Sequence, residues 1–159
     1  MKHLTHDDLI IKNKFGNTQL HYVCYNRHLE IVKELLPRLN YEDLIIQNTF
    51  GNTPLHHACI EGHLEIVKEL LRQLNHEELN KKNKNGCRPL MYACLHDHLK
   101  IIKVLILNGS PIVDYPQYNA CMKSIKWSKK EHKYVMHIQT RQNMQFIFMM
   151  YRHTMLEKL

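Results

Sequence analysis

The sequence predicts an all-α fold, a solenoid of stacked helix-turn-helix units joined by short hairpin loops. The first observation is an internal repeat, because residues 13–47 and 48–82 share 21 identities in 35 aligned positions. The second is that a weaker copy of the same pattern returns at the same distance in residues 83–114. Self-similarity at a fixed period of about 20 to 50 residues is typical of supersecondary units that bury their apolar faces by stacking.

Each repeat is predicted to open with a tight turn and then to enter a helix. The turns contain Gly16, Gly51 and Gly86. Glycine adopts the positive φ that such turns require at little steric cost. Pro54 and Pro89 stand where a first helical position is expected, because the backbone N–H there would have no helical partner in any case. Thr53 is the expected N-cap of the middle repeat.

A second helix is predicted in each repeat from apolar residues that recur at helical spacing. We expect these residues to form the core, because one repeat cannot bury such a face alone and must stack on its neighbours. Pro37 is expected to end or kink the first of these helices. The apolar residues are Leu29, Ile31, Val32, Leu35 and Leu36, then Leu64, Ile66, Val67, Leu70 and Leu71, then Leu99, Ile101, Ile102, Leu105 and Ile106.

Short helical turns are predicted between the repeats. A capping residue stands three positions before an acid at three places one period apart, in residues 5–8, 40–43 and 75–78. This is the spacing of a capping box, in which the two side chains bond to each other's backbone N–H groups.

The middle repeat reads Thr53-Pro54-Leu55-His56-His57-Ala58, and its second helix is predicted to follow Gly62-His63. This pattern resembles the ankyrin repeat, whose signature is Thr-Pro-Leu-His-x-Ala and whose period is about 33 residues. We attribute the longer period of this chain to the predicted capping turns. The resemblance implies an ankyrin-repeat solenoid in which the motif histidine ties hairpin to helix by hydrogen bonds.

The outer repeats depart from the family pattern. The first has Gln19 in place of the proline, and the third has Arg88 and Met91 in place of the threonine and the histidine. Asp97 replaces Gly62 at the turn between the two helices of the third repeat.

We expect ankyrin repeats over residues 1–110, followed by a different segment. The repeats are placed at 13–47, 48–82 and 83–114, after a partial N-terminal cap at 1–12. Residues 111–159 lose the signature and are expected to form a degenerate helical C-terminal cap. This cap is basic, with 8 Lys and Arg against 3 Asp and Glu. Binding of nucleic acid or of an acidic surface through the basic tail is therefore an alternative function.

Composition indicates a single intracellular domain. The chain has 159 residues, 44% of them hydrophobic, and no apolar run approaches the ~18 residues that span a bilayer. No secretory signal is expected, because the amino terminus lacks an apolar stretch and a small-residue cleavage site. We expect a cytoplasmic monomer, with the nucleus as the alternative location.

The cysteines and histidines do not indicate a metal site or an active site. Cys24, Cys59 and Cys94 share one phase of the repeat, so stacking separates them by about one repeat, too far for one zinc with Zn–S bonds of ~2.3 Å. Cys87 and Cys121 lie outside this phase and are expected to be free thiols. The histidines at the motif position and at the turns between helices pair with no plausible nucleophile at short range; they are His21, His56, His28, His63 and His98. We expect no metal, no cofactor and no enzymatic activity.

The resemblance implies contact positions on a concave surface. They are the two residues before the hairpin glycine, the one after it, and the two before the turn between helices. Among them Phe15, Tyr25, Phe50, Ile60 and Leu95 are apolar at positions that should face water, which favours a partner site. The alternative is that Phe15 and Phe50 fold back on neighbouring hairpins. The predicted protein-binding residues are Lys14, Phe15, Asn17, Tyr25, Asn26, Thr49, Phe50, Asn52, Ile60, Glu61, Lys84, Asn85, Leu95 and His96, with Cys87 also at a contact position.

The sequence therefore predicts a non-enzymatic module that binds a protein partner on the concave face. Nucleic acid is not the expected partner, and no membrane contact is expected. A further alternative, suggested by the small size and by the use of Asn, Lys and Ile, is a viral or microbial ankyrin protein that engages host proteins.

Overall fold

A computed structural model describes residues 5–111 and residue 126. Almost all of the predicted cap at 111–159, including Cys121 and the basic tail, lies outside these residues. The described part contains α-helices and two short 3-10 helices and no strand. In chain order the elements are α1 (His6–Ile10), α2 (Gln19–Tyr25), α3 (Leu29–Leu35), η1 (Leu36–Arg38), α4 (Tyr41–Leu44), α5 (Pro54–Ile60), α6 (Leu64–Leu71), η2 (Glu78–Asn80), α7 (Pro89–Leu95) and α8 (Leu99–Leu107).

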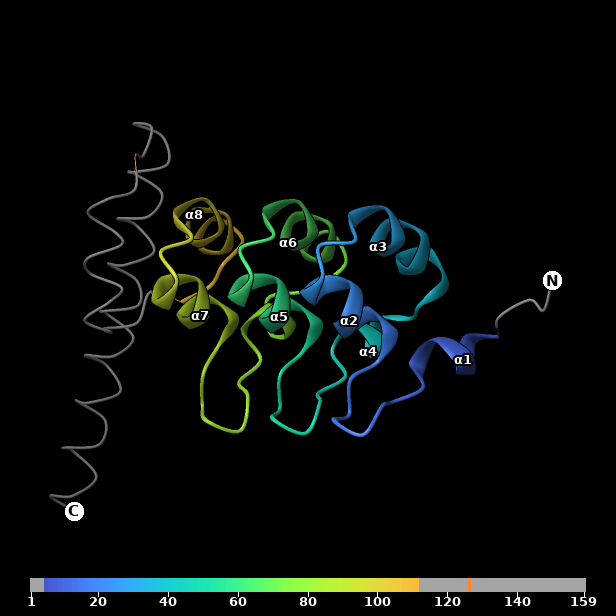
Figure 1. Ribbon diagram of the computed structural model, residues 1–159. Coiled ribbons are helices and arrows are strands. Elements are labelled where there is room, and N and C mark those ends of the chain that lie inside the picture. The colour runs from blue at the N-terminus through green and yellow to red at the C-terminus, as the bar shows by residue number, and fades with distance from the viewer. Residues whose placement is uncertain (1–4, 112–125, 127–159) are drawn as a thin grey trace, which may run out of the picture.

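The helices form two rows, and this arrangement confirms the predicted all-α solenoid (Figure 1). The first helices of the repeats, α2, α5 and α7, lie side by side in one row, and α3, α6 and α8 lie in the other. The hairpins extend from the row of first helices to one side. The core lies between the rows, where one repeat packs on the next.

Two histidines fix the start of the first helices in the first and second repeats. The backbone N–H of Thr18 donates to Nδ1 of His21 over 3.1 Å, and Thr53 makes the same bond to His56. The histidine thus has the role that an acid plays in a capping box. Met91 stands at this place in the third repeat, and its thioether, a weak acceptor with no donor, cannot make both of the bonds that the histidine makes.

The same histidines join successive repeats. His21 donates through Nε2 to the carbonyl oxygen of Asn52 over 3.0 Å, and His56 donates to that of Cys87 over 3.1 Å. Because Nδ1 accepts and Nε2 donates, each ring is neutral. Both rings are buried, and burial lowers the pKa of His21 and of His56 to about 4.

A second histidine of each of the later repeats contacts the repeat before it. His63 stands immediately before α6 and donates to the carbonyl oxygen of Tyr25 over 2.9 Å. His98 stands before α8 and donates to that of Ile60 over 3.0 Å. These bonds satisfy carbonyl groups at the ends of α2 and α5, which a helix leaves without partners of its own. The sequence placed these residues at the turns but did not predict the bonds.

The hairpins are joined by backbone hydrogen bonds. The N–H of Thr49 donates to the Phe15 carbonyl over 3.0 Å, and the N–H of Lys84 donates to the Phe50 carbonyl over 3.1 Å. The glycine of each turn has positive φ, as predicted. A methyl group on Gly51 would lie 2.6 Å from the backbone nitrogen of Lys84, so the close approach of two hairpins also requires this glycine.

The capping turns and the effect of Pro37 are confirmed. Thr5 with Asp8, and Asn40 with Asp43, form capping boxes at the starts of α1 and α4. Asn75 and Glu78 make the same pair of bonds, although only the 3-10 helix η2 forms there. α3 ends at Leu35, and η1 contains Pro37.

The core agrees with the predicted apolar set except at one residue. Ile66 and Ile101, at the same position of α6 and α8, are buried, whereas Ile31 of α3 is 40% exposed. α3 has no second helix of an earlier repeat beside it in the described part of the chain, so nothing there covers Ile31. The prediction that Ile31 lies in the core is therefore wrong. Cys24, Cys59 and Cys94 are buried, and burial raises the pKa of the Cys24 and Cys59 thiols.

We predict that Gly51→Ala destabilises the protein more than Gly86→Ala. Both glycines have φ near +75°, so both variants carry the strain of a side chain in the left-handed region. A methyl group at Gly51 also meets the next hairpin, whereas at Gly86 no atom of the described residues lies within 4 Å. Urea denaturation should show a difference of about 1 kcal/mol or more. Equal losses would show that the hairpins separate easily.

We also predict that stability falls between pH 7 and pH 5. His21 and His56 have folded pKa values near 4, below the unfolded value of about 6.5, so the unfolded chain binds more protons in this interval. Each should contribute a loss on the order of 2 kcal/mol at pH 5. His6 acts in the opposite sense, because its bond to Asp43 raises its pKa.

The measurement is the free energy of unfolding against pH for the wild type and for His56→Asn. The variant should be less stable at pH 7 and should have the shallower pH dependence. Parallel curves would contradict the assignment of a buried neutral histidine at this position.

Candidate functional site

The candidate site is a surface that we name the hairpin face. It consists of the tips of the three hairpins and the exposed side of α2, α5 and α7, from which the hairpins extend (Figure 1). The bonds from Thr49 to Phe15 and from Lys84 to Phe50 hold neighbouring tips in register. Equivalent residues of the repeats therefore form rows along this face, as expected for a stacked array.

Asparagines at the base of the hairpins support these rows. Oδ1 of Asn48 accepts from the backbone N–H groups of Phe50 and Asn52, while its Nδ2 donates to Oδ1 of Asn17 over 2.8 Å. Asn83 repeats the pattern and donates to Asn52, also over 2.8 Å. Asn17 and Asn52, predicted as partner-binding residues, are thus half-buried and engaged in holding one hairpin to the next.

Aromatic rings line the inner corner between hairpins and first helices. His57 of α5 faces Nδ2 of Asn48 over 3.2 Å, and Tyr92 of α7 accepts from Asn83 at the equivalent place. The Tyr25 ring, one repeat earlier, meets the His57 ring edge-on with centroids 6.0 Å apart. Burial lowers the pKa of His57, and its Nδ1 is buried with no hydrogen-bond partner among the described residues. Sequence reasoning did not select His57 or Tyr92.

The predicted apolar contact residues are exposed, with one exception. The exposed fractions are 62% for Phe50, 50% for Tyr25, 48% for Phe15 and 45% for Leu95. Phe15 and Phe50 are bound to neighbouring hairpins through their backbone carbonyls, while their rings remain half-exposed or more. Ile60, at the end of α5, is only partly exposed. The expectation that it faces water like the other four residues is therefore wrong.

The polar members of the predicted site lie along the same rows. Thr49 donates its hydroxyl to the Phe15 carbonyl over 2.9 Å, and Asn26 donates to the Tyr22 carbonyl. Nζ of Lys14 lies 4.9 Å from the centre of the Phe15 ring. The remaining predicted residues that are exposed are Glu61, Lys84, Asn85 and His96, while Cys87 is half-buried.

Chemistry other than contact is not indicated in the described part of the chain. Within residues 5–111 and 126, no group of three or more His, Cys, Asp or Glu side chains could hold a metal ion. A polar pair of His6 and Asp43, which are 2.7 Å apart, joins α1 to α4. None of the helices described has both the length and the apolar character needed to cross a membrane.

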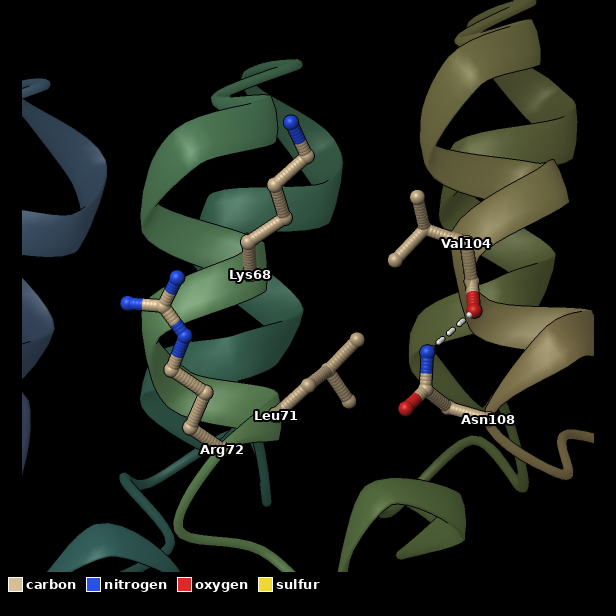
Figure 2. A pocket seen from close by; sticks show the side chains of 5 residues that line it. All are labelled: Lys68, Leu71, Arg72, Val104 and Asn108. Atoms are coloured by element: carbon tan, nitrogen blue, oxygen red, sulfur yellow. Dashed lines mark hydrogen bonds between the residues drawn. The ribbon is translucent and has the colours of Figure 1, made fainter.

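A groove of about 260 Å³ lies between α6 and α8, on the row of second helices. Figure 2 shows Leu71 of α6 pointing across it toward Val104 of α8 and Asn108, the residue after α8, with Lys68 and Arg72 on the α6 side. Its polar groups already have partners, since Lys68 pairs with Glu65, Arg72 pairs with Glu69, and Asn108 donates to the Val104 carbonyl. We interpret this groove as a seam between stacked repeats. A binding pocket would have polar groups that converge on a ligand.

Comparison with known proteins agrees with the fold. A search of the curated proteins finds no match to the sequence. The family model described as "Ankyrin repeats (3 copies)" matches residues 1–76 and 42–115. These matches cover most of the chain and include all three repeats with their hairpins. The chain therefore belongs to the ankyrin-repeat family.

Proposed function

We propose that this chain is a non-enzymatic module that binds a protein partner on the hairpin face. Ankyrin repeats are generally modules of protein–protein interaction and are typically without catalytic activity. The family thus gives the class of function, while the choice of surface comes from this chain's own residues.

The observation that carries the proposal is a set of four exposed apolar residues on the hairpin face, two at hairpin tips and two at the ends of first helices. Phe15, Tyr25, Phe50 and Leu95 come from three consecutive repeats and are each about half-exposed or more. Burial of such side chains would contribute about 25 cal/mol for each Å² of apolar surface removed from water. Aromatic side chains are also enriched among residues that dominate binding energy at interfaces.

The opposite surface does not have this character. On the second helices, Glu30 pairs with Lys33, Glu65 with Lys68 and Glu69 with Arg72, each pair three residues apart. Exposed pairs of this kind contribute little to stability and are typical of a solvated helix surface. A partner would have to desolvate these charges, so the hairpin face is the better binding surface.

We predict that Phe15→Ala with Phe50→Ala weakens binding of the natural protein partner by at least ~30-fold, or about 2 kcal/mol. Both rings lie at hairpin tips, and their own hydrogen bonds to the next hairpin come from the backbone, which alanine keeps. The partner would be captured from the source cell with the full chain, identified by mass spectrometry and measured by calorimetry.

The matched control is Ile31→Ala with Tyr41→Ala, which removes two exposed apolar side chains outside the hairpin face. This control should bind normally. Neither double variant should change the free energy of unfolding by more than about 1 kcal/mol, because exposed side chains contribute little to the stack. Normal binding by the hairpin variant, or equal losses in both variants, would contradict the proposed surface.

A further inference from the structure

Acidic and basic residues are distributed differently among the elements of the described part of the chain. Every segment that forms a hairpin and its first helix lacks acidic residues, since neither Asp nor Glu occurs in residues 11–25, 45–60 or 80–95. The acids of the repeats lie in the capping turns, the turns between helices and the second helices. The cations in the three acid-free segments are Lys12, Lys14, Lys81, Lys82, Lys84 and Arg88.

These cations lie at the two ends of the hairpin face. Lys12 and Lys14 belong to the first hairpin, and the other four belong to the third, whereas residues 45–60 contain no Lys or Arg. The middle hairpin instead presents Phe50, which is 62% exposed and so the most exposed of Phe15, Tyr25, Phe50 and Leu95. Along its hairpins the face is therefore basic at both ends and apolar between them, and the one acid among the predicted contact residues, Glu61, lies away from the hairpin tips at the end of α5.

The cations have no carboxylate partners within the described part of the chain. None of the six takes part in an ion pair there, in contrast to Lys33, Lys68 and Arg72 on the second helices. Lys12, Lys14, Lys82 and Lys84 are exposed, and Nε of Arg88 is buried with no hydrogen-bond partner. A low density of negative charge around grouped cations gives a positive potential that favours an acidic partner.

We infer that the partner of this chain contributes an acidic segment in which carboxylates stand on both sides of an apolar anchor. This inference rests on the proposed function and specifies the chemistry of the segment that the hairpin face binds. The apolar anchor packs on Phe50, one acidic group faces Lys12 and Lys14, and the other faces the cations of the third hairpin.

The stack sets the spacing of the two acidic groups. Packed helices lie about 10 Å apart, so the first and third hairpins are separated by about 20 Å. An extended chain advances about 3.3 Å per residue, so about six residues separate the two acidic groups. A nucleic acid carries a phosphate at every nucleotide and would place charge over the neutral middle hairpin, which fits this face less well.

The test is selection of random peptides of about twelve residues, displayed on phage, against the full chain. This length spans the face when extended. Selected peptides should carry Asp or Glu on both sides of an aromatic or aliphatic residue. Measured as synthetic peptides, they should bind the double variant Lys82→Glu with Lys84→Glu at least ~10-fold more weakly than the wild-type chain. The matched control, Lys33→Glu with Lys100→Glu, changes the net charge equally on the second helices and should change affinity by less than about 2-fold.

Each other outcome overturns the inference. Neutral peptides that lose affinity only with Phe15→Ala and Phe50→Ala would leave the proposed function standing but remove the acidic partner. Acidic peptides that respond equally to both pairs of charge reversals would show attraction by net charge alone. Failure to enrich any peptide would also overturn it, while the capture of a natural partner remains a separate test of the proposed function. Tighter binding of a single-stranded oligonucleotide, lost with Lys82→Glu and Lys84→Glu, would favour nucleic acid instead.

Discussion

The structure depends on one repeated hydrogen-bond unit, a buried neutral histidine that joins a helix start to the next hairpin. In the first repeat, the backbone of Thr18 donates to Nδ1 of His21, and Nε2 of His21 donates to the carbonyl of Asn52. One ring therefore fixes both the start of its own helix and the position of the following hairpin relative to that helix. A buried polar group is costly unless it is bonded, so the ring is favourable only when both partners are in place. Helix start, hairpin position and stacking are coupled for this reason, and the coupling is absent in the third repeat, where Met91 replaces the histidine.

This coupling separates the scaffold from the surface. Backbone groups, asparagine side chains and histidine rings provide the bonds between repeats, as in the link from Thr49 to Phe15 and in that from Asn48 to Asn17. The Phe15 and Phe50 rings make none of these bonds and can differ without disturbing the stack. The same fold can thus present different surfaces, which is why membership of the family gives a class of function but no identity for the partner.

Most of the scaffold could be predicted from the sequence, because its signals are local. The turn glycines, Pro54 at a helix start and the capping box at Asn40 each depend on residues a few positions apart. The errors concern contacts between repeats. Ile31 has the helical phase of a core residue, but phase cannot say whether a neighbouring repeat covers it. The position of Asn52 in its hairpin also does not reveal that Nδ2 of Asn83, on the neighbouring hairpin, donates to its Oδ1; its predicted contact with a partner stays a prediction. Whether a residue at the end of the stack or between two repeats is exposed depends on the neighbouring repeats. The sequence of a single repeat does not contain this information.

The same distinction applies to charge. The net charge of +7 and the excess of cations in residues 111–159 direct attention to the tail. In residues 1–110 the numbers of acidic and basic residues are nearly equal, so the sequence gives no sign of a charged surface there. Folding nevertheless places the acids on the second helices and turns and leaves several cations on the hairpins. Charges within about 10 Å of one another act together at moderate ionic strength, whereas more distant ones are screened. A partner that approaches the hairpins therefore meets a local field set by the arrangement of the repeats, and a total taken along the chain does not describe it. Because the stack fixes that field, the field restricts the orientation in which an acidic partner can dock. Complementary charge contributes more to such specificity, and to the rate of association, than to affinity itself.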